Sequence, residues 1–229
     1  MKKKTMYTEL SYVLGLLLLA FGTALITISD FGVSMIVAPA YLLHLKISTF
    51  APFFSFGMAE YTLQGVIIIV MCIVLRRFHY SYLFSFVTAV LYGLCLDGSL
   101  MLVASFPTES WALRLCFYVF GMLLATLGVA LFFRTYISPE AYELFVKKVS
   151  AKFGVDIHKF KLGYDAVSLV LSVVMSFAFY GFGVFEGIGW GTLASTVLNG
   201  TLIALWSGLL DNCFSFADKL PLAKYFDED

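Results

Sequence analysis

The sequence has little charge. Only 13% of its 229 residues are Asp, Glu, Lys or Arg, whereas hydrophobic types make up 61%. A soluble domain has about 25% charged residues, and a soluble chain with so few charges would expose apolar surface that aggregates. The mean hydropathy of +0.92 also excludes a disordered chain. The composition therefore predicts an integral membrane protein.

Other absences narrow the function. The 15 basic residues equal the 15 acidic ones, so there is no basic excess for binding nucleic acid. The four cysteines and three histidines show no metal-binding spacing, and we expect no metal and no cofactor. The sequence contains no P-loop, no G-x-S-x-G and no Ser/His/Asp set with usable spacing. We therefore expect neither an enzyme nor ATP-driven pumping by this chain alone.

Apolar runs long enough to cross a membrane occur six times. A span needs about 20 such residues. The N-terminal lysines and first run superficially resemble a signal peptide, but no clear cleavage site follows, so we interpret the run as a retained span. The predicted spans are 10–28, 58–75, 82–104, 112–133, 164–180 and 191–210.

The distribution of basic residues supports this count. With the N-terminus in the cytoplasm, 13 of the 15 Lys and Arg residues fall on the cytoplasmic side, and only Lys46 and Arg114 fall outside. Cytoplasmic loops of membrane proteins carry such an excess. We therefore predict that both termini are cytoplasmic.

The sequence contains an internal repeat. Gly15 and Gly22 of the first span recur 106 residues later as Gly121 and Gly128, each pair followed by Ala and Leu at matching positions. The third and sixth spans agree at an offset of 107, and the second and fifth at 103. This similarity indicates two halves of three spans each.

Three spans are an odd number, so the second half must enter the membrane from the opposite side. Inverted repeats are typical of transporters and channels, although a duplication retained only for helix packing gives the same pattern. We predict an all-α integral membrane fold with one domain. Its parts are repeat 1 at about 8–106, repeat 2 at about 110–212, and a short cytoplasmic tail at 213–229.

Each half has a short segment after its first span. Segment 33–45 is apolar but too short to cross, so it either re-enters the membrane or lies on its surface. Ser34 is its expected N-cap. The counterpart, 138–153, carries Ser138 as its expected cap and three lysines in its second half. We predict a membrane-surface helix there, on the cytoplasmic face.

Three short motifs resemble a known family. They are GTAL at 22–25 with FGVS at 31–34, KLGYD at 161–165, and GVFEGIGWGTLA at 183–194. Together they are similar to the YczE/YitT-type bacterial membrane proteins, over nearly the whole chain. The resemblance implies a compact multi-span protein of the bacterial inner (plasma) membrane, suspected of transport. It implies no substrate and no catalytic residues.

Carboxylates in or beside spans are the sharpest chemical signal, because an unpaired carboxylate is costly to bury. Asp97 lies inside the third span, and its alternative is a hydrated residue near the outer interface. The outer side has a net charge of −3, which predicts a cationic or cation-coupled substrate. The same excess also arises simply because basic residues are retained inside. The candidate site residues are Asp97, Glu60, Gln64, Asp30, Ser34, Tyr92, Asp165, Tyr164, Asn199 and Trp190.

These patterns favour a small-solute transporter or permease whose site lies between the two repeats. Two alternatives remain: a substrate-binding membrane subunit of a larger transport complex, and a non-transporting accessory membrane protein. The expected partners are membrane lipid and a small-molecule or ion substrate. Glycine-rich helix faces also permit a homodimer.

Overall fold

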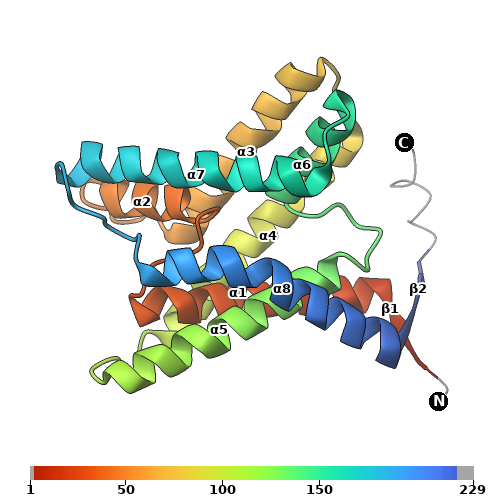
Figure 1. The fold of residues 1–229 in the computed structure, drawn as a ribbon, viewed down its shortest axis with the longest axis horizontal. Helices are drawn as coiled ribbons and strands as arrows, with labels where there is room; N and C mark the ends of the chain where they lie inside the picture. The colour runs from red at the N-terminus through yellow and green to blue at the C-terminus, as the bar shows by residue number, and fades with distance from the viewer. Residues whose placement is uncertain (1–2, 221–229) are drawn as a thin grey trace.

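The computed structural model describes residues 3–220, in which helices dominate (Figure 1). Within that range there are eight helices and two short strands. In chain order they are β1 (Lys4–Tyr7), α1 (Thr8–Ser29), α2 (Ala38–Ile47), α3 (Phe56–Leu75), α4 (Tyr80–Val103), α5 (Trp111–Phe132), α6 (Ala141–Phe153), α7 (Ile157–Tyr180), α8 (Trp190–Cys213) and β2 (Phe214–Ala217).

The long helices confirm a helical, multi-pass membrane protein. Six helices are long and apolar enough to cross a membrane, and they match the six predicted spans to within a few residues. The largest difference is at α7, which begins at Ile157 rather than near 164. Its first two turns carry Lys159 and Lys161, so the helix extends beyond its apolar stretch at a polar end.

The two strands bring the ends of the bundle together. β1 and β2 pair in parallel, with Lys4 opposite Phe214 and Tyr7 opposite Ala217. The Glu9 carboxylate accepts hydrogen bonds from the backbone N–H groups of Lys219 and Leu220. Because β1 leads directly into α1 and β2 follows α8 directly, both helices have these ends on one side. A chain that starts and ends on the same side of a membrane crosses it an even number of times, which agrees with six spans. Residues 221–229 of the predicted tail lie outside the described residues.

The equivalent helices α1 and α5 form the centre of the bundle and run antiparallel. Gly15 packs against Gly128, and Gly22 packs against Gly121, so the order along one helix is reversed along the other. A Cβ atom on Gly22 would lie 2.6 Å from the carbonyl oxygen of Gly121. Only small residues permit such close backbone contact between helices in a membrane.

The short helix α6 lies against α3 rather than flat on a surface. The backbone N–H of Ala141 donates to Oε1 of Gln64, near the middle of α3, at 3.0 Å. At its other end, Lys152 Nζ donates to the carbonyl of Val74 at 2.6 Å. Helix α6 therefore extends from beside the middle of α3 to beside its C-terminus.

The predicted membrane-surface helix at 138–153 is present as α6, and it packs against α3. Tyr142 and Val149 are only 4% and 3% exposed because they pack against protein, whereas Phe153 at the end of the helix is 60% exposed. The prediction of Ser138 as the N-cap is wrong, because the N-cap of α6 is Glu140. The lysines lie in the last two turns, near the polar end of the bundle.

The short helix α2 has the corresponding place in the first half. Lys46 near its C-terminus donates to the carbonyl of Phe179, at the end of α7, while Ala38 at its start is fully buried. Ser34 is not the N-cap: the helix starts after Val37, and the Ser34 carbonyl accepts the N–H groups of Val37 and Ala38. In Figure 1, α2 and α6 lie near opposite ends of α7.

The two halves differ in one contact. In the first half, α3 and α4 pack together where Gly57 meets Gly93. Along the described chain, α7 and α8, which the predicted repeat makes their equivalents, barely touch. A Cβ atom on Gly200, the counterpart of Gly93, would meet no other described atom within 4 Å. The second half is therefore open where the first is closed.

Candidate functional site: a cavity between the two halves

A cavity of about 290 Å³ lies where α7 and α8 separate. Helices α1, α5 and α8 form its walls, together with the starts of α6 and α7 and the segment before α2. Both short helices therefore begin at this cavity. Helix N-termini carry partial positive charge and free N–H groups, and such ends surround the binding sites of several transporter folds.

Four of the predicted site residues line this cavity. They come from different parts of the chain: Ser34, Tyr92, Asp165 and Asn199. The Tyr92 hydroxyl donates to Oγ1 of Thr23 at 3.1 Å, which fixes its ring in the wall. Within residues 3–220, Oδ1 of Asp165 is buried without a hydrogen-bond partner. These residues supply polar groups to a wall that is otherwise mainly apolar, as ligand sites generally are.

Glu60 and Gln64 lie directly behind the cavity wall. Tyr142 is one of the residues that line the cavity, and its hydroxyl donates to Oε2 of Glu60 at 3.0 Å. Gln64 Nε2 donates to Oε2 of Glu140 at 3.2 Å. Glu60 is 0% exposed and Glu140 is 8% exposed. Glu60 and Gln64 are thus linked to the cavity by their hydrogen bonds with Tyr142 and Glu140.

Sequence reasoning missed these residues of α6. Glu140, Tyr142 and Glu143 all line the cavity, but segment 138–153 was assigned to the membrane surface. The available signal was the uneven charge of that segment: no basic residue occurs in it before Lys147. An acidic, otherwise apolar half preceding a basic half fits a helix that starts inside the bundle.

Asp97 lies away from the cavity and caps α3. Its Oδ2 accepts from the Ser55 hydroxyl at 2.5 Å, and its Oδ1 accepts from the backbone N–H of Gly57 at 2.8 Å. These bonds hold the start of α3 against α4. A carboxylate at a helix N-terminus is favourable because it meets free N–H groups and the positive end of the dipole.

Three other predicted residues also lie elsewhere. Asp30 is exposed and pairs with Arg114 at 2.8 Å, beyond the end of α1. Trp190 is exposed at the start of α8. The Tyr164 ring packs against Phe145, with centroids 5.5 Å apart, and is not part of the cavity lining.

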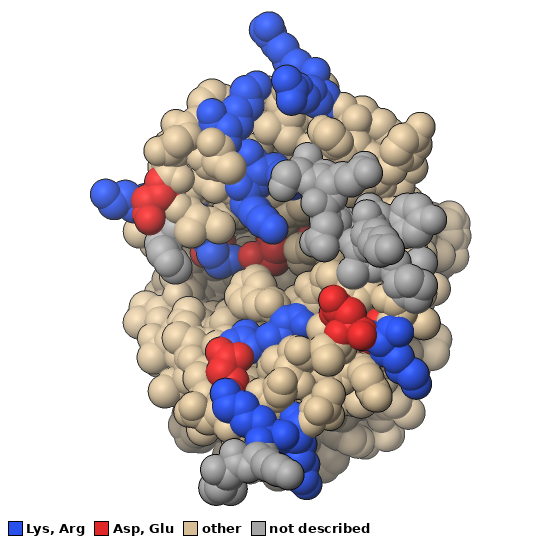
Figure 2. Space-filling model, turned by 90° about the vertical axis from the view of Figure 1, so that its right-hand side faces the viewer, with Lys and Arg blue, Asp and Glu red and all other residues tan. Residues whose placement is uncertain are grey.

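The cavity reaches the end of the bundle where the strands and most basic residues lie, here called the basic face. Lys161 and Glu143 line it there and form an ion pair at 3.0 Å. Figure 2 views this face: Lys and Arg gather on it, and a hollow crosses it between its upper and lower parts. The cavity therefore opens toward the basic face.

The opposite end is closed by a barrier in which residues 31–33 pack against 187–192. The N–H of Val33 donates to the carbonyl of Gly187 at 3.0 Å, and the N–H of Gly191 donates to the carbonyl of Phe31 at 2.8 Å. Gly32 has φ +97°, and a Cβ there would lie 2.4 Å from the Gly189 nitrogen. This backbone contact leaves no room for side chains.

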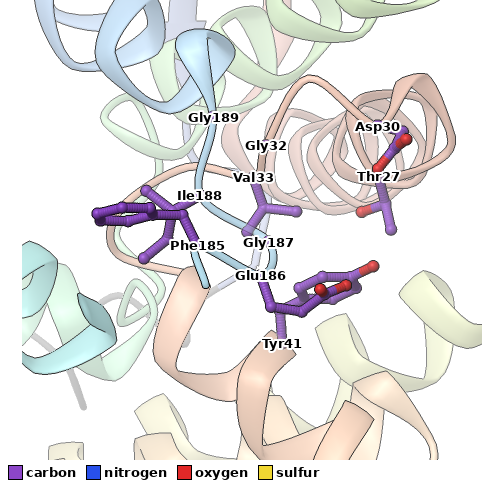
Figure 3. A pocket seen from close by; sticks show the side chains of 10 residues that line it. All are labelled: Thr27, Asp30, Gly32, Val33, Tyr41, Phe185, Glu186, Gly187, Ile188 and Gly189. Carbon is purple, nitrogen blue, oxygen red and sulfur yellow. The ribbon is translucent and has the colours of Figure 1, made fainter. Parts of the chain in front are cut away.

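A second pocket, of about 130 Å³, lies on the outer side of this barrier (Figure 3). Gly32 and Val33 line the outer pocket, whereas the next residue, Ser34, lines the cavity. On α1, Thr27 lines the pocket and Ile26 the cavity. Neighbouring residues of the same two segments therefore line the outer pocket and the cavity.

Comparison with known proteins gives a family but no activity. Among curated proteins and among solved structures, no match was found. In the described part of the chain, no group of three or more His, Cys, Asp and Glu side chains is placed to hold a metal ion. A model of a family of unknown function, DUF6198, matches residues 6–208, from β1 into α8. The chain therefore belongs to the DUF6198 family of unknown function.

Proposed function

We propose that this chain is a small-solute membrane transporter, with its substrate site in the cavity and alternating access between the two halves. The observation that carries the proposal is one cavity that is walled by both halves, open at one end and closed at the other by the backbone contact of residues 31–33 with 187–192. Such a site between repeats is characteristic of secondary transporters.

Inverted repeats are part of this proposal. Three features support them: the same order of one long, one short and two long helices in each half, the antiparallel contact of α1 with α5, and the crossed packing of α2 on α7 and α6 on α3. We further infer that α2 and α6 re-enter the membrane from opposite sides. Their backbone ends face a cavity, where such irregular segments are tolerated.

The orientation of the chain follows from its charges. Because basic residues concentrate on the cytoplasmic side of membrane proteins, we assign the basic face to the cytoplasm of a bacterial inner membrane. The open cavity then corresponds to an inward-facing state. A relationship to the YczE/YitT-type proteins belongs to the same proposal, on the motifs given above.

The charges of the cavity support a cationic or cation-coupled substrate. Glu140, Glu143 and Asp165 line it together with one basic residue, Lys161. Two of the acidic residues behind the outer net charge of −3 have other partners, since Asp97 caps α3 and Asp30 pairs with Arg114. The carboxylates that support a cation are therefore those of the cavity wall rather than those of the outer surface.

Thiol labelling tests this proposal before any substrate is known. A variant without Cys72, Cys95, Cys116 and Cys213 would carry Asn199→Cys in the cavity, and a membrane-impermeant maleimide would be applied to each side of oriented vesicles. Two control cysteines replace exposed residues, Phe153 at the basic face and Phe182 in the opposite loop. Each control should label from one side only.

An alternating-access transporter exposes Asn199→Cys to both sides, quickly from the basic face and more slowly from the other. Labelling from the basic face alone would contradict alternating access and favour a binding or accessory subunit.

A further inference from the structure

Two buried carboxyl groups beside the cavity each have one oxygen without a partner. These atoms are Oε1 of Glu60 and Oε1 of Glu140; in the region the structure describes, neither accepts a hydrogen bond. The other oxygen of each group is bound, by Tyr142 and by Gln64 respectively. No basic side chain within 4 Å neutralises either group among residues 3–220.

Two bare negative charges in such a place are unfavourable. A buried carboxylate needs an opposite charge or further donors, and two neighbouring carboxylates also repel each other. The site therefore calls for a bound cation. Since Glu60 and Glu140 lie on different halves, that cation also removes repulsion across the contact between α3 and α6.

The number of available ligands indicates which kind of cation the site can bind. A bound metal cation such as Ca²⁺ takes six to eight oxygen ligands and Mg²⁺ takes six, and in the described chain these two carboxyl groups belong to no set of three or more acidic or His/Cys side chains. A proton needs a single oxygen lone pair. Two carboxyl groups with so few ligands around them therefore suit protons better than a metal ion.

We propose that Glu60 and Glu140 bind protons that arrive through the cavity. Glu140 lines the cavity and accepts a proton from cavity water directly. Glu60 is reached through Tyr142: its hydroxyl proton moves to Glu60 Oε2 as the hydroxyl oxygen takes a proton from cavity water. In this step the O–H bond of Tyr142 breaks, one O–H bond forms on Glu60, and a new O–H bond forms on Tyr142. A hydronium ion that gives the proton becomes water, and a water molecule that gives it becomes hydroxide.

The coupling of these protons to solute movement rests on the proposed function, but proton binding does not. Protonation removes the charge repulsion between α3 and α6, and α6 begins at the cavity. Loss of the protons would push α6 from α3, and its N-terminus would shift relative to the solute. The solute would thus move together with protons.

Infrared difference spectroscopy tests proton binding on the full-length protein in lipid nanodiscs, with no solute present. A jump in pH should change the carbonyl-stretch bands of two protonated carboxyl groups. Glu60→Gln should abolish one band and Glu140→Gln the other. Asp30→Asn serves as the matched control because its carboxylate is exposed and ion-paired, and it should leave both bands unchanged.

Tyr142→Phe separates proton transfer from a structural role. It retains both carboxyl groups, but it should slow the response of the Glu60 band at least tenfold and leave the Glu140 band fast. Bands unaffected by Glu60→Gln and Glu140→Gln would overturn the proposal. Loss of the bands on adding Na⁺ at constant pH would also overturn it and assign the site to a metal cation.

A separate measurement distinguishes the two proposals. Acidification at the basic face should change the labelling rate of Asn199→Cys severalfold relative to that of the Phe153→Cys control, which reports the pH dependence of the thiol reaction itself. Glu60→Gln should remove this relative change. Proton bands with one-sided labelling would retain the proton site and reject the transporter. Labelling from both sides without proton bands would retain the transporter and reject the proton site.

Discussion

The hydroxyl of Thr192 donates a hydrogen bond of 2.7 Å to the carbonyl oxygen of Val33, joining α8 to the segment before α2 across the barrier. Both residues are buried. A buried carbonyl left without its donor costs about 1–3 kcal/mol. This single bond therefore contributes directly to keeping the outer end closed.

Thr192→Val should open the barrier more often. The variant retains the side-chain volume but lacks the donor, so labelling of Asn199→Cys from the outer side should increase about fivefold or more, as about 1 kcal/mol would produce. Thr196→Val is the matched control one turn along α8, because among residues 3–220 its hydroxyl bonds only to the carbonyl of Thr192. Equal effects of the two variants would contradict the role of the barrier.

Gly200→Leu should fill the cavity without disturbing the fold. The position lines the cavity, and a Cβ atom there has no described neighbour within 4 Å. We expect a thermal unfolding temperature close to that of the wild type, with labelling of Ser34→Cys reduced at least tenfold. Gly208→Leu, on the same helix and equally uncrowded in the described structure, lies outside the cavity lining. It should change neither measurement.

Gly22→Leu should separate α1 from α5. A Cβ atom at Gly22 would lie 2.5 Å from the Ala125 nitrogen, and overpacking of this kind costs about 1–3 kcal/mol or more. The expected result is a lower unfolding temperature in detergent. Gly98→Leu is the control, because no described atom lies within 4 Å of its Cβ position. A stable Gly22 variant would argue against a close α1–α5 contact.

Glu9→Ala should loosen the pairing of β1 with β2. The Glu9 carboxylate accepts from the Tyr136 hydroxyl at 3.0 Å as well as from the backbone after β2. Without it, hydrogen exchange measured by mass spectrometry should accelerate in residues 214–220. Tyr136→Phe removes one of these bonds and should have a smaller effect. Unchanged exchange in both variants would show that the strand bonds alone hold this end.

Tyr136 should titrate late. Burial, and then the hydrogen bond to the Glu9 carboxylate, raise its pKa to about 12, whereas a free tyrosine has a pKa of about 10. Because the folded value is the higher one, its contribution to stability is complete below about pH 10 and is lost as the pH rises through 12. The tyrosinate absorbance difference between the wild type and Tyr136→Phe measures this midpoint. Glu9→Gln should lower it.

The spans were predictable because hydropathy is a local property of the sequence. The start and end of α3, for example, differ by no more than two residues from the prediction. The glycines that predict a repeat, such as Gly22 and Gly121, do lie in close contact between α1 and α5, and the repeat itself stays a prediction. The strands were not predicted, because four-residue segments acquire their structure only from a partner 210 residues away.

The site was predictable only in part. Ser34, Tyr92, Asp165 and Asn199 were recognised as polar groups in or beside apolar segments, and they do meet in one cavity. The interpretation of Asp97 needed its partners, since sequence alone does not show that the start of α3 lies against it. Likewise, the separation of α7 from α8 depends on packing among distant helices, which no local pattern encodes.

The paired strands restrict how this chain can move. By joining β1 to β2 they tie the two ends of the polypeptide into a ring, and Arg134 fastens α5 to α8 on the same side through Asp211. Helices α1, α5 and α8 are thereby held together as one unit at the basic face. In the proposed alternating-access cycle we therefore expect α7 to move most, together with the short helices α2 and α6 that pack against it.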